Sequence, residues 1–309
     1  MTFDRSADAR LGPDTCSVGA RARRDPLIGS APPAAGWLIF EQPGPWPVKA
    51  TSVFGALGPE MDRRTLAVQV RPMLVRRPGR ADPARSAPHA WWFVDSVTQA
   101  WVRGTWRDED DVRAALDLVD RRRAEATAQM TPADPMLLVC AHAKHDVCCA
   151  VRGRPIAGSL AEHWPEYVWE CSHLGGDRFA GNVAILPAST FYGGLDETDC
   201  VQVIADDLAG AVSLDHYRGS GTDNSAAQAA VAGLLRHYGS RRLGDVTVSG
   251  QHVVTEGEWD VELSGRGELP AHTVLRVVRR WRKPEQLTCR GAGPVISAEY
   301  QVEVKGPHP

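Results

Sequence analysis

One order of secondary-structure elements is predicted twice along the chain, and this repetition limits the folds that the chain can adopt. The first occurrence begins with an apolar strand over 38–41, a helical segment within 51–70 and a short strand around 73–75. A hairpin within 89–106 follows. The acidic start and basic end of residues 108–126 then indicate a helix. This stretch therefore reads strand, helix, strand, hairpin, helix.

The second occurrence starts at PMLLVC (135–140), a continuous apolar strand. It continues with a helix over 149–164, a strand over 167–171, a hairpin within 181–197 and a helix over 198–211. The mixture of strand–helix–strand units and hairpins predicts an α/β protein. We interpret the repetition as an internal duplication of architecture, and the element order suits a thioredoxin-like fold.

The sequence pattern changes on both sides of the duplicated region. The first 26 residues alternate charges with small polar residues, which is typical of a flexible arm. Beyond residue 212, a helix precedes short strands that suit a small antiparallel unit. We therefore expect a flexible N-terminal arm (1–26), a degenerate thioredoxin-like half (27–130), a second thioredoxin-like half with the metal site (131–211) and a helix plus a β-rich C-terminal unit (212–309).

Charge and hydropathy exclude several classes of partner. The formal net charge of the 309 residues is −3, which gives no global attraction to nucleic acid or to an anionic membrane surface. The chain has no apolar run of about eighteen residues, the length that a transmembrane helix needs. Its first residues also lack the apolar stretch of a signal peptide. We expect a cytoplasmic protein with neither a nucleic-acid nor a membrane partner.

The cysteines point to metal or redox chemistry. The chain has seven, and four of them, Cys140, Cys148, Cys149 and Cys171, lie close together in the sequence. An odd total without an export signal argues against a disulfide framework, and clustered cytosolic cysteines favour metal binding or catalysis. Cys16, Cys200 and Cys289 are distant in sequence and receive no role.

Two of the clustered cysteines are predicted to face one crevice. Cys140 ends a core strand, and Cys149 begins the next helix, whose N-terminus lowers the pKa of a thiol. In α/β sheets, sites form beyond the carboxyl ends of the strands. The segment that follows the next strand should lie beside them, so Cys171, His173 and Asp177 become candidate ligands.

Several neighbouring residues have two readings. Gly175 and Gly176 allow a backbone to approach a cofactor closely, but they equally suit a tight turn. His142 and His145 lie in the loop between the cysteines, where they either tune a cluster by hydrogen bonds or remain exposed loop residues. Adjacent cysteines pair only with strain, so we assign Cys148 to buried packing.

The chain resembles the sucrase/ferredoxin-like family, whose members contain a thioredoxin-like ferredoxin domain. The resemblance runs through DPLIGSAPPAAGWLIFEQPGPW, RPMLVRRPGR, CAHAKHDVCCAVRGRP, WECSHLGGDRFAGNVAILPASTFYGG and LDHYRG. It implies a 2Fe–2S cluster bound by two cysteines and by two histidines of a His-x-Gly-Gly-His motif. The cysteines correspond to Cys140 and Cys149 and the first histidine to His173. Asp177 stands where the second histidine is expected.

This departure leaves three alternatives for the fourth ligand. Asp177 could coordinate the cluster directly, although carboxylate is a hard ligand and uncommon for such clusters. Cys171 could reach the site instead. Asp177 could also be a hydrogen-bond partner of a ligating histidine. The choice matters because histidine ligation raises the reduction potential and makes it depend on pH.

The resemblance implies a one-electron carrier between a cytosolic reductase and an acceptor, neither of which the sequence identifies. Two rival functions remain. One is a thiol–disulfide oxidoreductase that uses Cys140, Cys148 or Cys149, although the chain lacks a Cys-x-x-Cys motif. The other is a structural zinc module closed by Cys140, Cys149, Cys171 and His173. The sequence contains no convincing carboxylate pair for glycoside hydrolysis.

Overall fold

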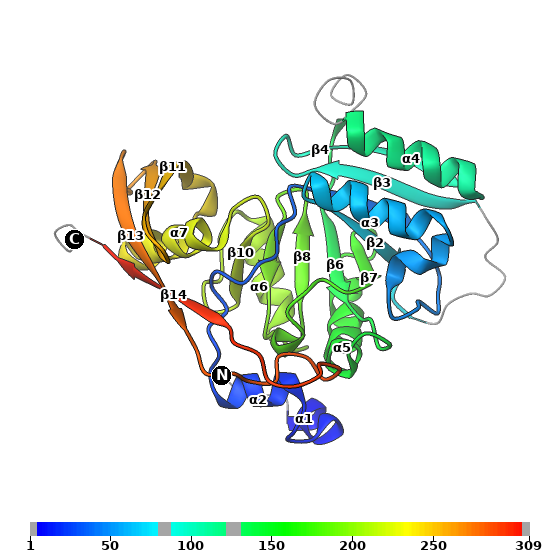
Figure 1. Ribbon diagram of the computed structural model, residues 1–309, viewed down its shortest axis with the longest axis horizontal. Coiled ribbons are helices and arrows are strands. Elements are labelled where there is room, and N and C mark those ends of the chain that lie inside the picture. Colours follow the sequence, from blue (N-terminus) through cyan, green and yellow to red (C-terminus); the bar gives the residue numbers. More distant parts are fainter. Residues whose placement is uncertain (1–4, 80–87, 122–130, 305–309) are drawn as a thin grey trace.

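The structure, a computed structural model, describes residues 5–79, 88–121 and 131–304. Within them the chain forms a large mixed sheet of ten strands and a separate antiparallel sheet of four strands (Figure 1). The protein is therefore of the mixed α/β class, as the sequence predicts.

The first half has the predicted element order. Its elements are β1 (Gly36–Glu41), a 3-10 turn (Ala50–Phe54), α3 (Leu57–Ala67), β2 (Val70–Arg76), β3 (His89–Asp95), β4 (Ala100–Trp106) and α4 (Glu109–Arg121). Strand β1 pairs in parallel with β2 and antiparallel with β3, which pairs antiparallel with β4. The last nine predicted positions of the first half, 122–130, lie outside the described residues.

The second half repeats this arrangement. Its elements are β6 (Met136–Cys140), α5 (Val147–His163), β7 (Val168–Cys171), a 3-10 turn (Asp177–Phe179), β8 (Val183–Leu186), β9 (Thr190–Tyr192) and α6 (Cys200–Leu208). Strand β6 pairs in parallel with β7 and antiparallel with β8, and β8 pairs with β9. The strand orders β2-β1-β3-β4 and β7-β6-β8-β9 therefore correspond.

The two halves share one sheet rather than forming separate sheets. They join through the antiparallel pair of β2 and β7, in which Val75 faces Cys171. In the same pair, Arg76 lies 2.7 Å from the buried carboxylate of Glu170. The helices of each half pack on one face of its strands, and a single hydrophobic cluster spans both halves on the opposite face. That shared face carries Cys140.

The edges of the large sheet correct one predicted boundary. A short strand, β5 (Thr131–Pro132), lies at one edge, and β10 (Tyr217–Ser220) pairs with β9 at the other. The boundary near 212 therefore falls too early, because β10 belongs to the large sheet. Arg218 of β10 helps to hold this strand in the large sheet, because its buried guanidinium hydrogen-bonds to groups of the second half.

The C-terminal unit consists of one helix and the four-stranded sheet, as predicted. Its elements are α7 (Ser225–His237), a 3-10 turn (Leu243–Asp245), β11 (Val246–Thr255), β12 (Glu258–Gly265), β13 (Thr273–Trp281) and β14 (Ala298–Glu303). Leu234 and Leu235 of α7 are fully buried in the cluster that includes strands of this sheet. The long connection between β13 and β14 returns to the start of α5, as Figure 1 shows at the lower edge.

The N-terminal segment differs from the flexible arm predicted over 1–26. It forms α1 (Arg5–Leu11) and α2 (Cys16–Ala22), and Cys16 and Ala20 are buried. The physical reason is a set of long-range contacts: Arg152 of α5 pairs with Asp8 and donates to Ser17 Oγ. These contacts hold both helices against α5.

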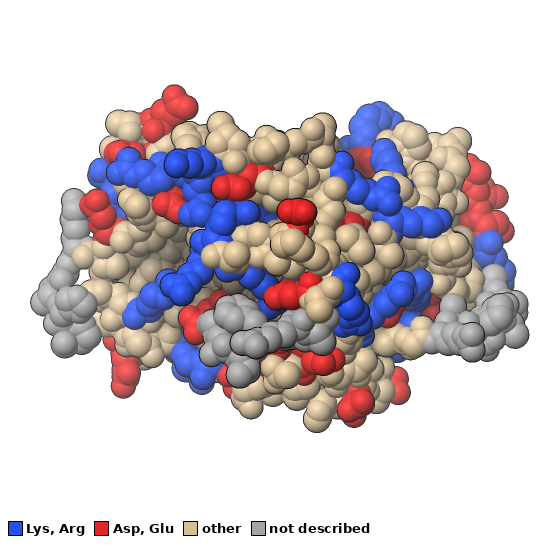
Figure 2. All heavy atoms as spheres, turned by 90° about the horizontal axis from the view of Figure 1, so that it is seen from below, with Lys and Arg blue, Asp and Glu red and all other residues tan. Residues whose placement is uncertain are grey.

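Charges on the lower surface are mixed in sign. Figure 2 shows basic and acidic side chains interspersed on the face that carries the N-terminal helices. Opposite charges also pair below the surface, where the buried carboxylate of Asp25 lies 3.0 Å from Arg23, 3.1 Å from Arg282 and 3.6 Å from Arg178. In the described residues, no helix is long and apolar enough to cross a bilayer.

Candidate metal centre

The start of α5 places Cys149 beside the end of β6. Asp146 is the N-cap of the helix, and its side chain accepts a hydrogen bond from the backbone N–H of Cys148. Gly153 lets the helix pass close to the strand, because a Cβ there would overlap the carbonyl oxygen of Cys140. The predicted arrangement of strand end and helix start is therefore present, with the helix beginning two residues before Cys149.

Two thiols and an imidazole converge at this point. The Sγ atoms of Cys140 and Cys149 and a ring nitrogen of His173 all lie within 4.8 Å of one another. Both cysteines are 1% exposed, whereas the His173 side chain is 25% exposed. These three residues, from β6, α5 and the loop after β7, form a group that could hold a metal ion.

His145 and Asp177 extend the group on the side of His173. The rings of His145 and His173 are stacked, with their centroids 3.7 Å apart. Asp177 Oδ1 lies 3.0 Å from His173 Nδ1, and Oδ2 lies 3.7 Å from His145 Nε2. Cys149 Sγ is 3.4 Å from Asp177 Oδ1, so the carboxylate touches both parts of the site. We call these five residues, Cys140, Cys149, His145, His173 and Asp177, the α5 donor cluster.

The two cysteines and His173 shift one another's pKa values. The pKa of the Cys140 thiol is lowered because Cys149 hydrogen-bonds to it and His173 also stabilises its thiolate, and these effects outweigh burial. The pKa of Cys149 is raised correspondingly. Burial alone would lower the pKa of His173, but hydrogen bonds to Asp177 and Cys140 raise it to about 9. The two shifts act in the same direction, toward a thiolate at Cys140 and a protonated ring at His173.

Asp177 stays ionised in this environment. Burial acts to raise the pKa of its carboxyl group, but the hydrogen bond from His173 and its positive charge lower that pKa overall, with further contributions from Thr288 and His145. The ionised carboxylate thus lies as a charge partner 3.0 Å from His173 Nδ1 and 3.7 Å from His145 Nε2.

Two arginines hold the loop that carries His173. Arg71 donates to the carbonyl oxygens of His173 and Leu174 at 3.4 and 3.1 Å. Arg218 donates to the carbonyl oxygen of Gly175 and to Asn182 Oδ1, both at 2.9 Å. Burial lowers the pKa of Arg218 to about 9. These two guanidiniums therefore hold the loop through its backbone carbonyl groups and Asn182.

The glycine pair serves this loop as a turn. Gly175 and Gly176 have φ angles of +91° and +78°, a region that other residues rarely adopt. A Cβ on Gly176 would lie 2.5 Å from a guanidinium nitrogen of Arg218. The backbone at Gly176 therefore does approach another group closely, but that group is the guanidinium of Arg218.

The remaining predicted site residues lie outside the α5 donor cluster. Cys171 is buried and pairs in register with Cys140, but it does not join any of the donor groups found among the described residues. His142 is 2% exposed, so it is not an exposed loop residue, and its Nε2 lies 2.8 Å from the carbonyl oxygen of Pro47. For His145 the sequence left two readings, a tuning role or an exposed loop residue, and no local pattern indicated its contacts with His173 and Asp177.

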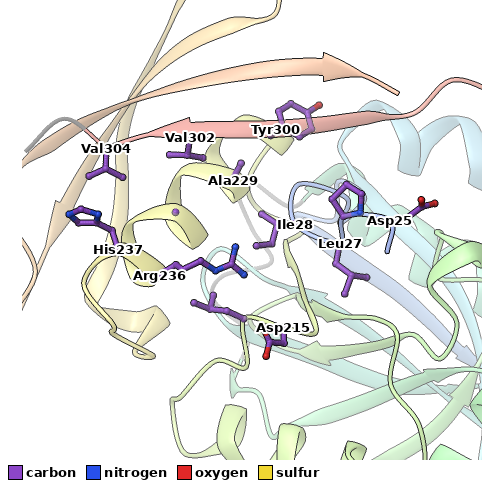
Figure 3. Close-up of a pocket in the computed structure, with 13 residues that line it drawn as sticks. Asp25, Leu27, Ile28, Asp215, Ala229, Arg236, His237, Tyr300, Val302 and Val304 are labelled. Atoms are coloured by element: carbon purple, nitrogen blue, oxygen red, sulfur yellow. The ribbon is translucent and has the colours of Figure 1, made fainter. Parts of the chain in front are cut away.

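The histidine side of the α5 donor cluster opens onto a cleft. This cleft has a volume of about 650 Å³, and its lining includes His145, His173, Lys49, Leu66 and Arg71. A second cavity, of about 550 Å³, lies between residues 25–28, α7 and β14 (Figure 3). None of the candidate ligands lines that second cavity. Access to the donors is therefore from the imidazole side.

Comparison with known proteins gives one match. The family model described as sucrase/ferredoxin-like matches residues 27–219, a span that includes both halves and most of β10. No curated protein and no solved structure matches the chain.

Proposed function

The chain belongs to the sucrase/ferredoxin-like family, and from the geometry of the α5 donor cluster we propose that it is a 2Fe–2S protein that transfers single electrons. The observation that carries this proposal is the convergence of Cys140, Cys149 and His173 from three separate segments. Thiolate and imidazole are the ligand types that such clusters take. The correspondence between the strand orders of the two halves supports a thioredoxin-like scaffold for this site.

We assign the two cysteines to one iron and two histidines to the other. His173 has Nδ1 beside Asp177, which leaves Nε2 for the metal. His145 stacks on His173 and supplies the second imidazole. Asp177 then orients both rings, because a ligating histidine usually donates its other N–H to a carboxylate or carbonyl. In this assignment His145 takes the role of the histidine that the family motif lacks here.

The unequal exposure of the donors supports an electron-transfer role. The thiols of Cys140 and Cys149 are buried, whereas the side chains of His145 and His173 are 31% and 25% exposed. A cluster held by these residues would supply one-electron chemistry. The imidazoles face the cleft, so a reductase and an acceptor would approach in turn on that side. Proton uptake by the same imidazoles would couple the potential to pH.

The test is anaerobic purification of the full chain, followed by assays of iron and acid-labile sulfide and by visible spectroscopy. We expect iron and sulfide in equal amounts, two of each per chain, and a visible spectrum that bleaches on reduction. Cys140→Ser and Cys149→Ser should abolish both. Cys171→Ala is the matched control, because it removes a buried thiol of the same sheet face. A colourless protein with zinc and no sulfide contradicts the proposal.

A second candidate function is thiol–disulfide exchange. It is favoured by the proximity of the Cys140 and Cys149 thiols, which are close enough to share one proton. Their 1% exposure weighs against it, since a protein disulfide must reach the attacking sulfur. Metal-free protein with a titratable Cys140–Cys149 dithiol would favour this function over the cluster.

A further inference from the structure

Three cysteines from distant parts of the chain meet at the first turn of α5. Cys16 Sγ lies 3.7 Å from Cys148 Sγ and 3.5 Å from Cys289 Sγ, and the Sγ atoms of Cys148 and Cys289 are 3.5 Å apart. Cys16 begins α2, Cys148 lies in the first turn of α5, and Cys289 lies in the connection between β13 and β14. The three sulfur atoms thus form a nearly equilateral triangle.

A carboxylate lies beside this triangle. Asp146 Oδ2 is 3.6 Å from Cys16 Sγ, and all four donor atoms lie within 4.8 Å of one another. The same oxygen accepts hydrogen bonds from the backbone N–H of Cys289 at 2.7 Å and from Thr288 Oγ1 at 3.1 Å. Its position is therefore fixed by the segment that brings Cys289.

The distances fit a tetrahedral zinc ion. With Zn–S bonds of about 2.3 Å, two thiolates of a regular tetrahedron lie about 3.8 Å apart, and with a Zn–O bond of about 2.0 Å a thiolate and an oxygen lie about 3.5 Å apart. The three sulfur–sulfur distances here are 3.5–3.7 Å, the distance from Cys16 Sγ to Asp146 Oδ2 is 3.6 Å, and the other two sulfur–oxygen distances are below 4.8 Å. We propose that Cys16, Cys148, Cys289 and Asp146 form a structural zinc site, separate from the α5 donor cluster.

The surroundings of the sulfurs support a closed site. Cys16 and Cys148 are 1% and 0% exposed, Cys289 is partly buried, and the three cysteines pack with Ala180 and Leu11. The backbone N–H of Cys16 donates to Cys289 Sγ at 3.4 Å, a contact that favours the thiolate form. The start of α5, a helix of 17 residues, adds its positive dipole end at Cys148. Four protein donors and an apolar cover are typical of structural rather than catalytic zinc.

A disulfide explains the cluster less well. An S–S bond is about 2.05 Å long, much shorter than the separations here, and all seven cysteines are free. Because the three sulfurs are almost equally spaced, a disulfide between any two would also leave the third cysteine unused.

The site would tie both ends of the chain to the centre. Cys16 comes from the N-terminal helices and Cys289 from the C-terminal connection, whereas Cys148 precedes a candidate ligand of the α5 donor cluster. Zinc would therefore link the first turn of α5 to the N-terminal helices and to the C-terminal connection. Zinc has no redox chemistry of its own, so its effect would be structural.

The experiment measures zinc, iron and sulfide separately on the purified full chain. We expect one zinc per chain in the wild type. Cys289→Ala should lose that zinc and retain iron and sulfide, whereas Cys149→Ala should lose iron and sulfide and retain zinc. Cys200→Ala, which removes a buried thiol outside both sites, should retain all three. If Cys149→Ala loses the zinc and Cys289→Ala keeps it, the assignment is wrong, whatever the outcome for iron.

A measurement on the wild type makes the test independent of how the variants fold. X-ray absorption at the zinc edge should give three sulfurs at about 2.3 Å and one oxygen at about 2.0 Å. Two sulfurs with imidazole nitrogen would place the zinc at Cys140, Cys149 and His173 and overturn the proposal. Wild-type protein without zinc, or with Cys16, Cys148 or Cys289 in a disulfide under non-reducing mass spectrometry, also overturns it.

Discussion

Cys148 and Cys149 are neighbours in the chain, but their thiols enter two different donor groups. Cys148 Sγ lies 3.7 Å from Cys16 Sγ, whereas Cys149 Sγ lies 3.4 Å from Asp177 Oδ1. Successive residues of a helix point about 100° apart, so one turn can serve two sites. The first turn of α5 is therefore shared, and a change that moves it should affect both groups.

The first prediction separates the two roles of Asp146, as helix cap and as zinc ligand. Asp146→Asn keeps a good N-cap for α5 but removes the negative charge. We expect zinc affinity to fall by more than the roughly 10–100-fold that loss of a hydrogen-bond partner of a ligand costs, because a ligand itself is removed. Competition with a chromogenic zinc chelator measures this change. Asp146→Ala should additionally lower the free energy of unfolding by about 1 kcal/mol through loss of the cap.

One outcome for Asp146→Asn would contradict the assignment of its carboxylate as a zinc ligand. If this variant binds zinc as tightly as the wild type while Cys16→Ala does not, then the carboxylate is only a helix cap and water or another donor completes the coordination.

The second prediction concerns His145 as a ligand of the second iron. His145→Cys replaces an imidazole by a thiolate, and thiolate ligation lowers the potential of a 2Fe–2S centre. We expect a reduction potential lower by on the order of 100 mV and a weaker dependence on pH. Protein-film voltammetry from pH 6 to 9 would measure both. His163→Ala, at the exposed end of α5, is the control and should leave the potential unchanged.

Asp177→Ala distinguishes this ligand assignment from direct ligation by the carboxylate. If Asp177 only orients the imidazoles, this variant should retain the iron–sulfur spectrum and lose the cluster more readily to a chelator. A variant that lacks the cluster altogether, together with a His145→Ala protein whose spectrum is unchanged, would make Asp177 the fourth ligand.

The third prediction tests the turn that carries His173. Gly176 and Gly210 have similar φ angles, +78° and +82°, so alanine strains the backbone comparably at both positions. Only at Gly176 does the new Cβ meet another group, the guanidinium of Arg218. We expect Gly176→Ala to lower the free energy of unfolding by about 2–3 kcal/mol and Gly210→Ala by about 1 kcal/mol. Urea unfolding measures both, and equal losses would show that Arg218 yields easily.

Local patterns were sufficient to predict the frame of the site. The continuous apolar run that ends at Cys140 gave β6, and the polar loop before Cys149 indicated a new helix, which the Asp146 cap starts slightly earlier than predicted. In the first half, the corresponding strand β1 ends on Glu41, where β6 ends on Cys140. The contrast is visible in the sequence.

Local patterns could not predict contacts between residues that are far apart in the sequence. Cys16 and Cys289 lie 132 and 141 residues from Cys148, and no spacing rule connects positions that different elements bring together. The place of His145 likewise depends on stacking against His173, which follows a different strand. The helices of the N-terminal segment are short, and their stability comes from packing against α5 rather than from their own sequence.

The last prediction concerns pH and a carboxyl group far from the metal ligands. Burial raises the pKa of Asp207 to about 6, against an ordinary value of 3.8, although its hydrogen bond from Tyr192, at 2.6 Å, partly offsets this. The folded protein therefore binds this proton more tightly than the unfolded chain does. The resulting stabilisation is complete below about pH 4 and is lost as the pH rises to about 6.

Asp207→Asn keeps an acceptor for Tyr192 and cannot ionise. Relative to the wild type, we expect the variant to gain about 2 kcal/mol in free energy of unfolding between pH 4 and pH 7. Asp206→Asn is the matched control, because the pKa of this neighbouring carboxyl group is lowered rather than raised, by its hydrogen bond from Arg241. Urea unfolding at both pH values measures the difference. A gain that does not change with pH would mean that Asp207 ionises in the folded protein as easily as it does in the unfolded chain.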